Sequence, residues 1–500
     1  MPLRRKILLT ACCTLLAGGL TGCGGSGPRG GSADGLEVGL IAEPASLDFS
    51  TTDGAAIPQA LLGNVYEGLV TVDQHGEIKP GLAERYERSA DGRTYTFHLR
   101  KGVKFTNGAS FTADDAVFSI NRVKTKWKLK IAHQMDVVSK AVKVDASTVK
   151  VTLKEPSNGW LHSMTSRVGA MFSRTGVSDL ARRPVGTGPF RLKTWRRGDR
   201  LVLDRNPGYW GTKPALSSVT LKYFKDAGAM NNAMLTGDLD VIGNVQAPET
   251  LSRFADKNRY RVIEGTSTAE VVLSMNNSRK PFTDKRVRQA VRHAIDHKAL
   301  LEATRDGRGT LIGTMESPTD PWYTDLAGRY PYDPARAKKL LREAGAEGST
   351  IRLRIPNLPY AVSSAQFVKD QLDRVGLKVS IETLEFPARW LSEVFTGADY
   401  DMSIIAHNEP RDQWIFADPD YYFRYRNSAY ADLLEEADTG EAGKEAGRIR
   451  KAVTMLSDDS PADWLYLLPN LMVANKKLTG LPVNQVGEGL NLSNVRWSGK

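Results

Sequence analysis

Short alternations of apolar and polar residues run through the first half of the chain, which is the pattern of β-strands with one buried face. The clearest alternations cover residues 95–100, 142–153, 190–195 and 200–204. A helix is expected over residues 112–123, because a threonine can cap its first turn and an aspartate follows three positions later. The first half is therefore predicted to be rich in strands.

The second half alternates between helical and strand-like segments. Apolar residues recur with helical spacing over residues 285–302, 334–344, 365–375 and 388–395. Strand-like segments at 351–355 and 377–383 lie between these helices. Strands and helices that alternate in this way predict βα units, and so an α/β fold.

The N-terminus has the order of a secretory signal, with three cations in its first six residues and then an apolar run at 7–16. That run is too short to span a bilayer, which takes about 20 apolar residues. Residues 20–23 read Leu-Thr-Gly-Cys and resemble the lipobox of bacterial lipoproteins, which implies lipidation of Cys23 and anchoring on the extracytoplasmic face of the cell membrane. An ordinary cleaved signal with a chance cysteine is the alternative. We expect a signal peptide over 1–22 and a glycine-rich, flexible tether over 23–35.

Composition is that of a globular protein, with 41% hydrophobic and 25% charged residues over a length of 500 that predicts two or three domains. All three cysteines, Cys12, Cys13 and Cys23, lie in the signal or at its end, which excludes disulfides and thiolate chemistry from the rest of the chain. The net charge is +11, or +8 without the signal, and the basic residues are scattered. We therefore expect no nucleic-acid partner.

Catalysis is the main competing class of function, and the sequence offers little for it. There is no GxSxG motif, no phosphate-binding loop and no catalytic cysteine. His293 and His297 stand four residues apart, a metal-binding spacing, but Ala294 occupies the position of a zinc protease's glutamate. We expect no enzyme activity, no cofactor and no metal site.

Several motifs point to a known family. They are EPASLD at 43–48, DG followed by YTFHLRKGVKF within 91–105, GTGPF at 186–190, NPGYW at 206–210 and RVRQA at 286–290. The chain resembles the family 5 extracellular solute-binding proteins, the dipeptide, oligopeptide and nickel receptors of ABC importers, over essentially the whole mature chain. The run within 91–105 is the most specific of these matches.

The resemblance implies a two-lobed α/β clamshell with an extra subdomain. Lobe one would cover residues 36–275, with the subdomain at about 70–185, lobe two would cover 276–475, and residues 476–500 would return to lobe one. The monomeric protein would close on a solute, most simply a di- or oligopeptide, and deliver it to an ABC permease and its ATPase. A nickel chelate, haem, a sugar or another small solute is the alternative ligand, and a non-transport receptor or chaperone is the alternative role.

The resemblance also implies where the ligand lies. Two backbone stretches would pair with an extended peptide, and an acidic side chain, Glu409, would hold its ammonium group. The stretches are Glu43, Pro44 and Ala45, and Ile405, Ala406 and His407. The family more often has an aspartate at the anchor and a tryptophan three residues earlier, where this chain has Ala406. His407 is also a candidate contact for a metal chelate.

Charged and aromatic residues cluster just beyond this anchor, in a segment that reads as a loop. The candidates for the binding site are Arg411, Asp412, Trp414, Asp418 and Tyr421, together with Trp322 from a rigid aromatic loop. The alternative interpretation is that the aromatic rings pack in a lobe core while the acids cap a helix.

Overall fold

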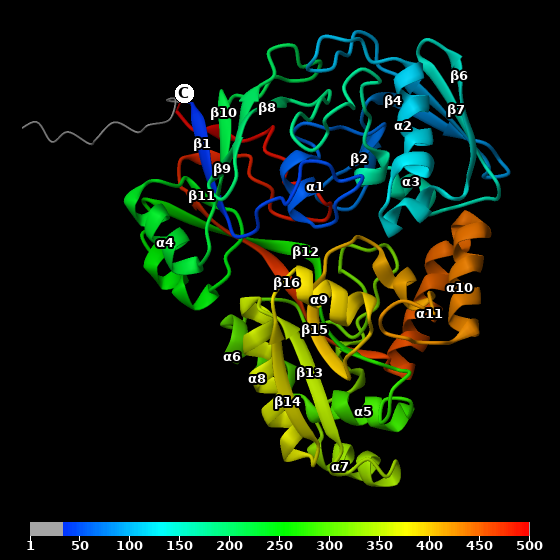
Figure 1. Ribbon diagram of the computed structural model, residues 1–500, viewed down its shortest axis with the longest axis vertical. Helices are drawn as coiled ribbons and strands as arrows, with labels where there is room; N and C mark the ends of the chain where they lie inside the picture. Colours follow the sequence, from blue (N-terminus) through cyan, green and yellow to red (C-terminus); the bar gives the residue numbers. More distant parts are fainter. Residues whose placement is uncertain (1–33, 500) are drawn as a thin grey trace, which may run out of the picture.

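The computed structural model describes residues 34–499, so the expected signal, tether and Cys23 lie outside the described part. The molecule is elongated and has two lobes, which β12 (Tyr260–Met275) and β16 (Ala462–Asn475) join (Figure 1). No helix in the described part is long and apolar enough to cross a membrane.

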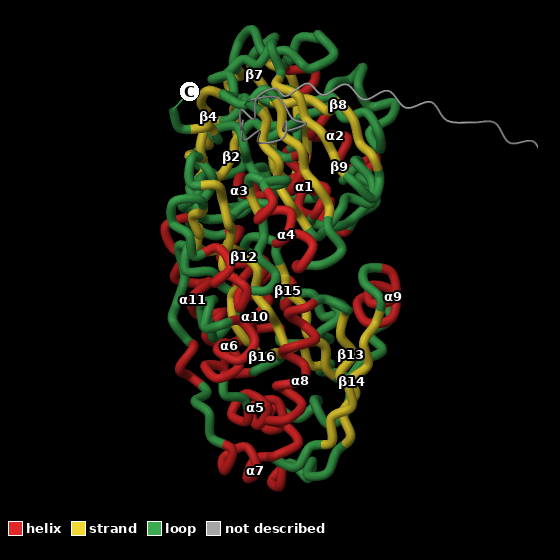
Figure 2. Tube along the Cα trace, turned by 90° about the vertical axis from the view of Figure 1, so that its left-hand side faces the viewer, coloured by secondary structure: helices red, strands yellow, loops and turns green. Residues whose placement is uncertain are grey.

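One ten-stranded sheet runs through both lobes in the order β14-β13-β15-β12-β16-β11-β1-β10-β9-β8. Its lobe-one strands are β1 (Gly35–Leu40), β8 (Phe190–Arg196), β9 (Arg200–Arg205), β10 (Ser218–Tyr223) and β11 (Val241–Ile242). Its lobe-two strands are β13 (Thr350–Pro356), β14 (Lys378–Leu384) and β15 (Met402–His407). In the side view β12 and β16 continue from one lobe into the other (Figure 2).

The β12–β16 ladder is interrupted where the chain passes between the lobes. Residues 260–265 pair with β16 in lobe one and residues 269–274 pair with it in lobe two, with a register shift between Gly265 and Ala269. The break leaves a short segment without ladder partners in β16. We therefore expect the two lobes to bend relative to each other at this break.

A subdomain of lobe one is built on the four-stranded sheet β4-β5-β7-β6. Its elements are β4 (Ala83–Arg88), β5 (Thr94–Leu99), β6 (Val138–Asp145), β7 (Thr148–Leu153) and α2 (Ala113–Lys126). The expected cap of α2 is confirmed, because the Asp115 carboxylate accepts a hydrogen bond from the Thr112 N–H at 3.1 Å. The alternation over 142–153 proves to be two strands of a hairpin, β6 and β7.

The remaining elements of lobe one are short. They are α1 (Ala56–Leu61), β2 (Val70–Val72), β3 (Ile78–Pro80), α3 (Trp160–Ser163), α4 (Ala227–Thr236), and the C-terminal β17 (Leu478–Thr479) and β18 (Arg496–Trp497). The C-terminal segment completes the lobe-one core, to which Leu490, Leu492 and Val495 belong. The buried Asn64 side chain binds both the Leu490 carbonyl, at 2.7 Å, and the Leu492 N–H, at 3.1 Å.

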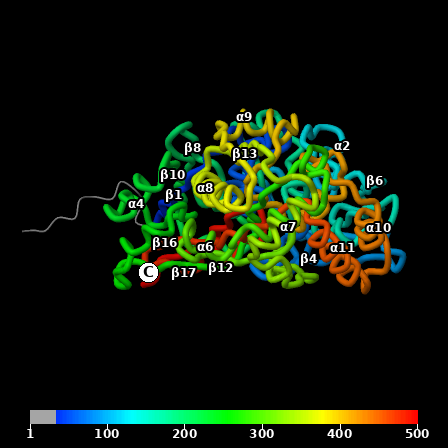
Figure 3. The backbone as a smooth tube through the Cα atoms, turned by 90° about the horizontal axis from the view of Figure 1, so that it is seen from below, coloured from blue at the N-terminus to red at the C-terminus, as the bar shows by residue number. Residues whose placement is uncertain are grey.

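Helices cover both faces of the sheet in lobe two. One face packs against α5 (Lys285–Ala294), α6 (His297–Arg305), α7 (Pro334–Glu343) and α8 (Pro359–Arg374), and the other against α9 (Ala388–Trp390), α10 (Ser428–Thr439) and α11 (Glu445–Asp459). Seen from below, α6 and α8 lie on the opposite side of the lobe from α10 and α11 (Figure 3).

Two sequence-based expectations for this lobe were wrong in detail. The single helix over 285–302 is two helices, because Ile295 is extended and Asp296 caps α6 by accepting from the Ala299 N–H. The helix expected over 388–395 has one short α-helical piece, α9, followed by a π-helical turn over Leu391–Thr396.

Candidate functional site

A cavity of about 300 Å³ lies between the two lobes, next to the break in β12. Lobe one contributes Ala42, Arg167, Gly243, Asn244 and Glu488 to its lining. Lobe two contributes Arg305, Tyr360, Ala406, Asn408 and Glu409, and residues 267–269 and 468–470 of the two connecting strands complete it. Because both lobes line it, a solute held there contacts both halves of the molecule.

A buried arginine in the wall of the cavity contacts three acids, of which Glu409 and Glu488 also line the cavity and Asp53 does not. The Arg167 guanidinium lies 3.1 Å from Glu488, 3.4 Å from Asp53 and 3.7 Å from Glu409. Burial raises the pKa of the Glu488 carboxyl, which also accepts from the Arg167 N–H at 2.7 Å. Glu409 has the longest of the three contacts, and its side chain is 49% exposed. One cation facing three carboxylates leaves the wall with excess negative charge, which favours a cationic group of a ligand.

More carboxylates lie behind Glu409, buried in lobe two. Burial raises the pKa of both Glu270 and Asp412; the charge of Asp412 adds to the shift of Glu270, and the charge of Glu409 adds to that of Asp412. Burial also raises the pKa of Asp320 to about 6. Glu270 Oε2 and Asp412 Oδ2 are buried without a hydrogen-bond partner within residues 34–499. These groups add to the negative potential on the Glu409 side of the cavity whenever they are ionised.

In the predicted stretch Ile405–His407, only Ala406 lines the cavity, and its N–H donates to the Tyr360 hydroxyl at 2.9 Å. Ile405 is buried in the lobe-two core. His407 Nε2 lies 3.0 Å from the Tyr422 hydroxyl, and burial lowers the pKa of this histidine to about 4. His407 is therefore a neutral, packed side chain near pH 7.

The predicted stretch Glu43–Ala45 lies beside the cavity, of which its neighbour Ala42 forms part. The Glu43 carboxylate accepts hydrogen bonds from Trp195 Nε1 at 3.0 Å and from the Gly198 N–H at 2.8 Å. This side chain holds the β8–β9 turn within lobe one, so what the stretch offers a ligand is its backbone. A role for it, including Pro44, stays a prediction.

The loop candidates do not line the cavity. The Arg411 guanidinium lies 4.7 Å from the centre of the buried Trp322 ring. Tyr421 contacts the Phe395 ring, and Trp414 packs against the same core. The Asp418 side chain is exposed, and its carboxylate accepts a hydrogen bond from the Asp420 N–H at 2.9 Å. A carboxylate oxygen of Asp412 lies within 4.8 Å of one of Glu409, which lines the cavity. Ligand contact by any of this group stays a prediction.

The two histidines with metal-like spacing lie on separate helices and have different partners. His297 Nε2 lies 2.9 Å from the buried Asp463 carboxylate, whereas His293 Nδ1 lies 2.9 Å from the Pro331 carbonyl oxygen. Ile295 and Asp296 end one helix and begin the next between them. Each histidine therefore serves a structural contact of its own.

The lobes also touch away from the hinge, between the subdomain and the end of α10. The Asp438 carboxylate accepts from the Ser157 hydroxyl at 2.9 Å and from the Gly159 N–H at 2.7 Å. Asn158 adds a backbone bond to the Asp438 carbonyl at 2.9 Å and a side-chain bond to the Ala437 carbonyl at 2.8 Å. We name residues 157–159 and 437–440 the latch, because these bonds hold the lobes together.

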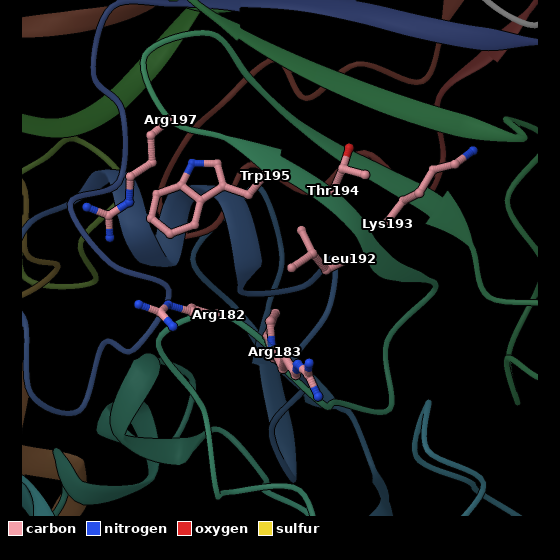
Figure 4. Close-up of a pocket in the computed structure, with 8 residues that line it drawn as sticks. Arg182, Arg183, Leu192, Lys193, Thr194, Trp195 and Arg197 are labelled. Atoms are coloured by element: carbon pink, nitrogen blue, oxygen red, sulfur yellow. The ribbon is translucent and has the colours of Figure 1, made fainter.

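A second, larger hollow of about 510 Å³ belongs to lobe one alone. Figure 4 shows Trp195 and Leu192 of β8 facing the loop that carries Arg182 and Arg183, with Arg197 stacked beside the Trp195 ring. Lobe two contributes nothing to its lining. It is therefore not the cavity that closure of the lobes would form.

Sequence reasoning missed most of the residues that line the cavity, among them Arg167, Arg305, Tyr360 and Glu488. None belongs to a local motif. Arg305 lies beyond the helix expected over 285–302, and Glu488 stands in a glycine-rich C-terminal segment. Only the meeting of distant segments in the fold brings them to the site.

Two lobes joined by two strands around a shared cavity define a two-lobed solute-binding protein. The model of the bacterial extracellular solute-binding proteins, family 5 (middle region), matches residues 77–431, and the chain belongs to this family. Its members are the extracytoplasmic, solute-binding components of ABC transporters rather than enzymes.

Curated relatives match along most of their length. A glutathione-binding protein GsiB of Salmonella paratyphi A is 32% identical over 470 residues, which cover 87% of this chain and 90% of the relative. The dipeptide-binding protein of Escherichia coli K12 is 27% identical over 464 residues, covering 82% and 85%.

Solved structures match the fold equally widely. The periplasmic binding protein DppA of Helicobacter pylori, in complex with the peptide STSA, has a TM-score of 0.82 at 25% identity and covers 93% of this chain and 98% of its own. NikZ of Campylobacter jejuni, in complex with Ni(L-His), has a TM-score of 0.80 at 20% identity and covers 94% and 100%. The expected two-lobed α/β fold is confirmed.

Proposed function

We propose that this protein captures a short peptide between its lobes and delivers it to an ABC permease, with Glu409 as the ligand's ammonium anchor. The observation that carries the proposal is the negatively charged wall of the cavity, where Arg167 faces Glu409, Glu488 and Asp53. Of the two acids that line the cavity, Glu409 is the more exposed, at 49% against 7% for Glu488, and it lies farther from the Arg167 guanidinium, at 3.7 Å against 3.1 Å. A ligand ammonium would complete its hydrogen bonding.

The size of the cavity supports a small ligand. About 300 Å³ lies at the lower end of the range of roughly 300–1,000 Å³ found for small-molecule sites. Di- and tripeptides fit such a volume better than long peptides. Relatives named for glutathione and for dipeptides are consistent with this size class.

Binding assays on the purified chain without residues 1–22 test the proposal. We expect the dipeptide Met-Leu or glutathione to raise the melting temperature by several degrees, since a ligand at 100 times its Kd adds about 2.7 kcal/mol of stability. Glu409→Gln should weaken binding by roughly 30-fold or more, and N-acetylation of the peptide should have the same effect. Glu435→Gln, at an exposed site on α10, is the matched control.

Two results would contradict the proposal. If no peptide shifts the melt, the ligand class is wrong. If peptides bind but acetylated and free forms bind equally to wild type and to Glu409→Gln, the ammonium anchor is wrong while the ligand class stands.

A nickel chelate is the second candidate ligand, favoured by one specific grouping. His407, Glu409 and Asp412 each offer a ligand atom within 4.8 Å of the others. However, His407 already bonds the Tyr422 hydroxyl, and only Glu409 of the three lines the cavity. Nickel with histidine therefore belongs in the same melting screen, and a shift with it alone would replace the peptide by the chelate.

The membrane attachment is also a proposal. We infer that residues 1–22 are removed on export and that lipid on Cys23 tethers the protein through residues 23–35. Cys23→Ala should move the protein from the membrane fraction to the soluble extracytoplasmic fraction. Retention of that variant on the membrane would exclude a lipid anchor at this cysteine. A monomeric state stays a prediction.

A further inference from the structure

Arg305 places a buried positive charge in the wall of the cavity. It is the last residue of α6 in lobe two, its surface is only 5% exposed, and it lines the cavity together with Tyr360 and Asn244. An arginine keeps its charge at any physiological pH, so burial does not neutralise it. A buried guanidinium normally has acidic or carbonyl partners for most of its donors.

The buried arginines of the described chain differ sharply in how well they are paired. Arg167 faces three carboxylates, Arg292 binds Asp463, Ser457 and Gly313, and Arg354 binds three acids. Arg288 donates to the carbonyls of residues 282, 459 and 460. Arg305 has a single hydrogen bond.

That single bond crosses the cleft. Arg305 Nη1 donates to the Gln246 carbonyl in lobe one at 3.0 Å, while its Nε is buried without a partner. Burial lowers the pKa of Arg305, and the charges of Tyr466 and exposed Glu249 oppose that shift only in part. Within residues 34–499 no carboxylate forms an ion pair with Arg305. The guanidinium therefore keeps unused donors at the wall of the cavity.

We propose that Arg305 binds a carboxylate of the ligand and so selects solutes that carry one in addition to their ammonium group. This rests on the proposed function, because it assigns the second charged end of the same peptide. A carboxylate offers two acceptor oxygens to the Nε and Nη2 donors of a guanidinium, the geometry of a bidentate pair. The carboxylate is the C-terminal one or an acidic side chain of the peptide.

Calorimetry with matched peptides tests the assignment. The probes are Met-Leu, Met-Leu amide, which lacks a carboxylate, and Ala-Glu amide, which keeps one only on its side chain. We expect Met-Leu to lose at least about 30-fold in affinity on amidation and the same amount on Arg305→Gln, with no further loss when both changes are combined. Binding of Ala-Glu amide that depends on Arg305 would place the carboxylate on a side chain.

Two variants separate recognition from structure. Arg305→Lys should recover part of the affinity because it keeps the charge. Ligand-free Arg305→Gln should melt at or above the wild-type temperature, since it removes a buried charge without a carboxylate partner. Arg374→Gln, at the exposed end of α8, is the control and should bind like wild type.

The outcomes distinguish the two proposals. If Met-Leu binds with equal affinity in acid and amide forms, or if Arg305→Gln binds it within threefold of wild type, the carboxylate assignment is overturned and the peptide function stands. If neither Met-Leu, Ala-Glu amide nor glutathione binds, the peptide function is overturned and this assignment falls with it.

Discussion

Removing the Asp438 carboxylate should shift the balance between open and closed lobes. In the latch this group accepts two hydrogen bonds from lobe one, at 2.7 and 2.9 Å. A hydrogen bond to a charged group contributes about 1.5–3 kcal/mol. Burial raises the pKa of Asp438, so part of that gain is offset by desolvation, and we take about 3 kcal/mol for the pair.

That energy acts only in the closed form, because in the open form water satisfies the same groups. Asp438→Ala should therefore lower the ratio of closed to open protein by about 100-fold, since 1.4 kcal/mol corresponds to a factor of ten. A ligand that needs the closed form would lose affinity in proportion to the fall in the closed fraction, by up to the same factor. Asp438→Asn keeps an acceptor oxygen and should lose less.

Calorimetry with Met-Leu gives the change in Kd, and small-angle scattering of the ligand-free protein shows the opening of the lobes. Asp432→Ala, an exposed acid on the same helix, controls for effects on α10 itself. A Kd within threefold of wild type, with unchanged scattering, would show that the latch does not contribute to closure, and the reasoning from its hydrogen bonds would be refuted.

Three further predictions concern stability. Asp463→Ala should lower the free energy of unfolding by about 3–5 kcal/mol in urea titrations, because it leaves the buried Arg292 without its carboxylate; a loss below 1 kcal/mol would contradict this. Burial raises the pKa of Glu316 to about 9, so the folded state binds more protons than the unfolded one between pH 4.5 and 9. Stability should therefore fall as pH rises through that window, by at most about 1.4 kcal/mol per pH unit from this group, and Glu316→Gln should flatten the profile measured by urea titration at several pH values. Gly265→Ala would put a methyl group 2.0 Å from the Val483 carbonyl oxygen beside the strand break, so it should lower the melting temperature; an unchanged melt would show that the 482–484 loop moves freely.

Local patterns predicted most individual elements. The alternation at 95–100 matches β5, and the Thr112 and Asp115 pair marks the start of α2 correctly, because both signals depend only on nearby residues. The division of the 285–302 helix was missed because the apolar stripe continues across Ile295 and Asp296. Hydrophobic spacing reports which face is buried and does not report where the backbone turns.

The sequence predicted cavity-lining residues only at positions to which the family resemblance assigned a role. Glu409 and Ala406 were predicted and line the cavity, whereas His407 was predicted and packs against Tyr422 instead. On a strand, neighbouring side chains point to opposite faces, which is why the Ala406 side chain lines the cavity while those of Ile405 and His407 pack in the lobe. Backbone pairing of residues 405–407 with a ligand stays a prediction. Arg305 and Glu488 could not be predicted, because no nearby residue in the sequence signals that they line the same cavity.

The return of the chain to lobe one has a consequence for folding. Lobe two is contiguous in sequence, and its two ends lie side by side, since Ser274 pairs with Ala462. Lobe one begins first but needs β16 and the core residues Leu490, Leu492 and Val495, which are synthesised last. The lobe that starts the chain is thus the last to be completed, and a chain that stops short of its final 25 residues would be expected to hold a finished lobe two and an unfinished lobe one.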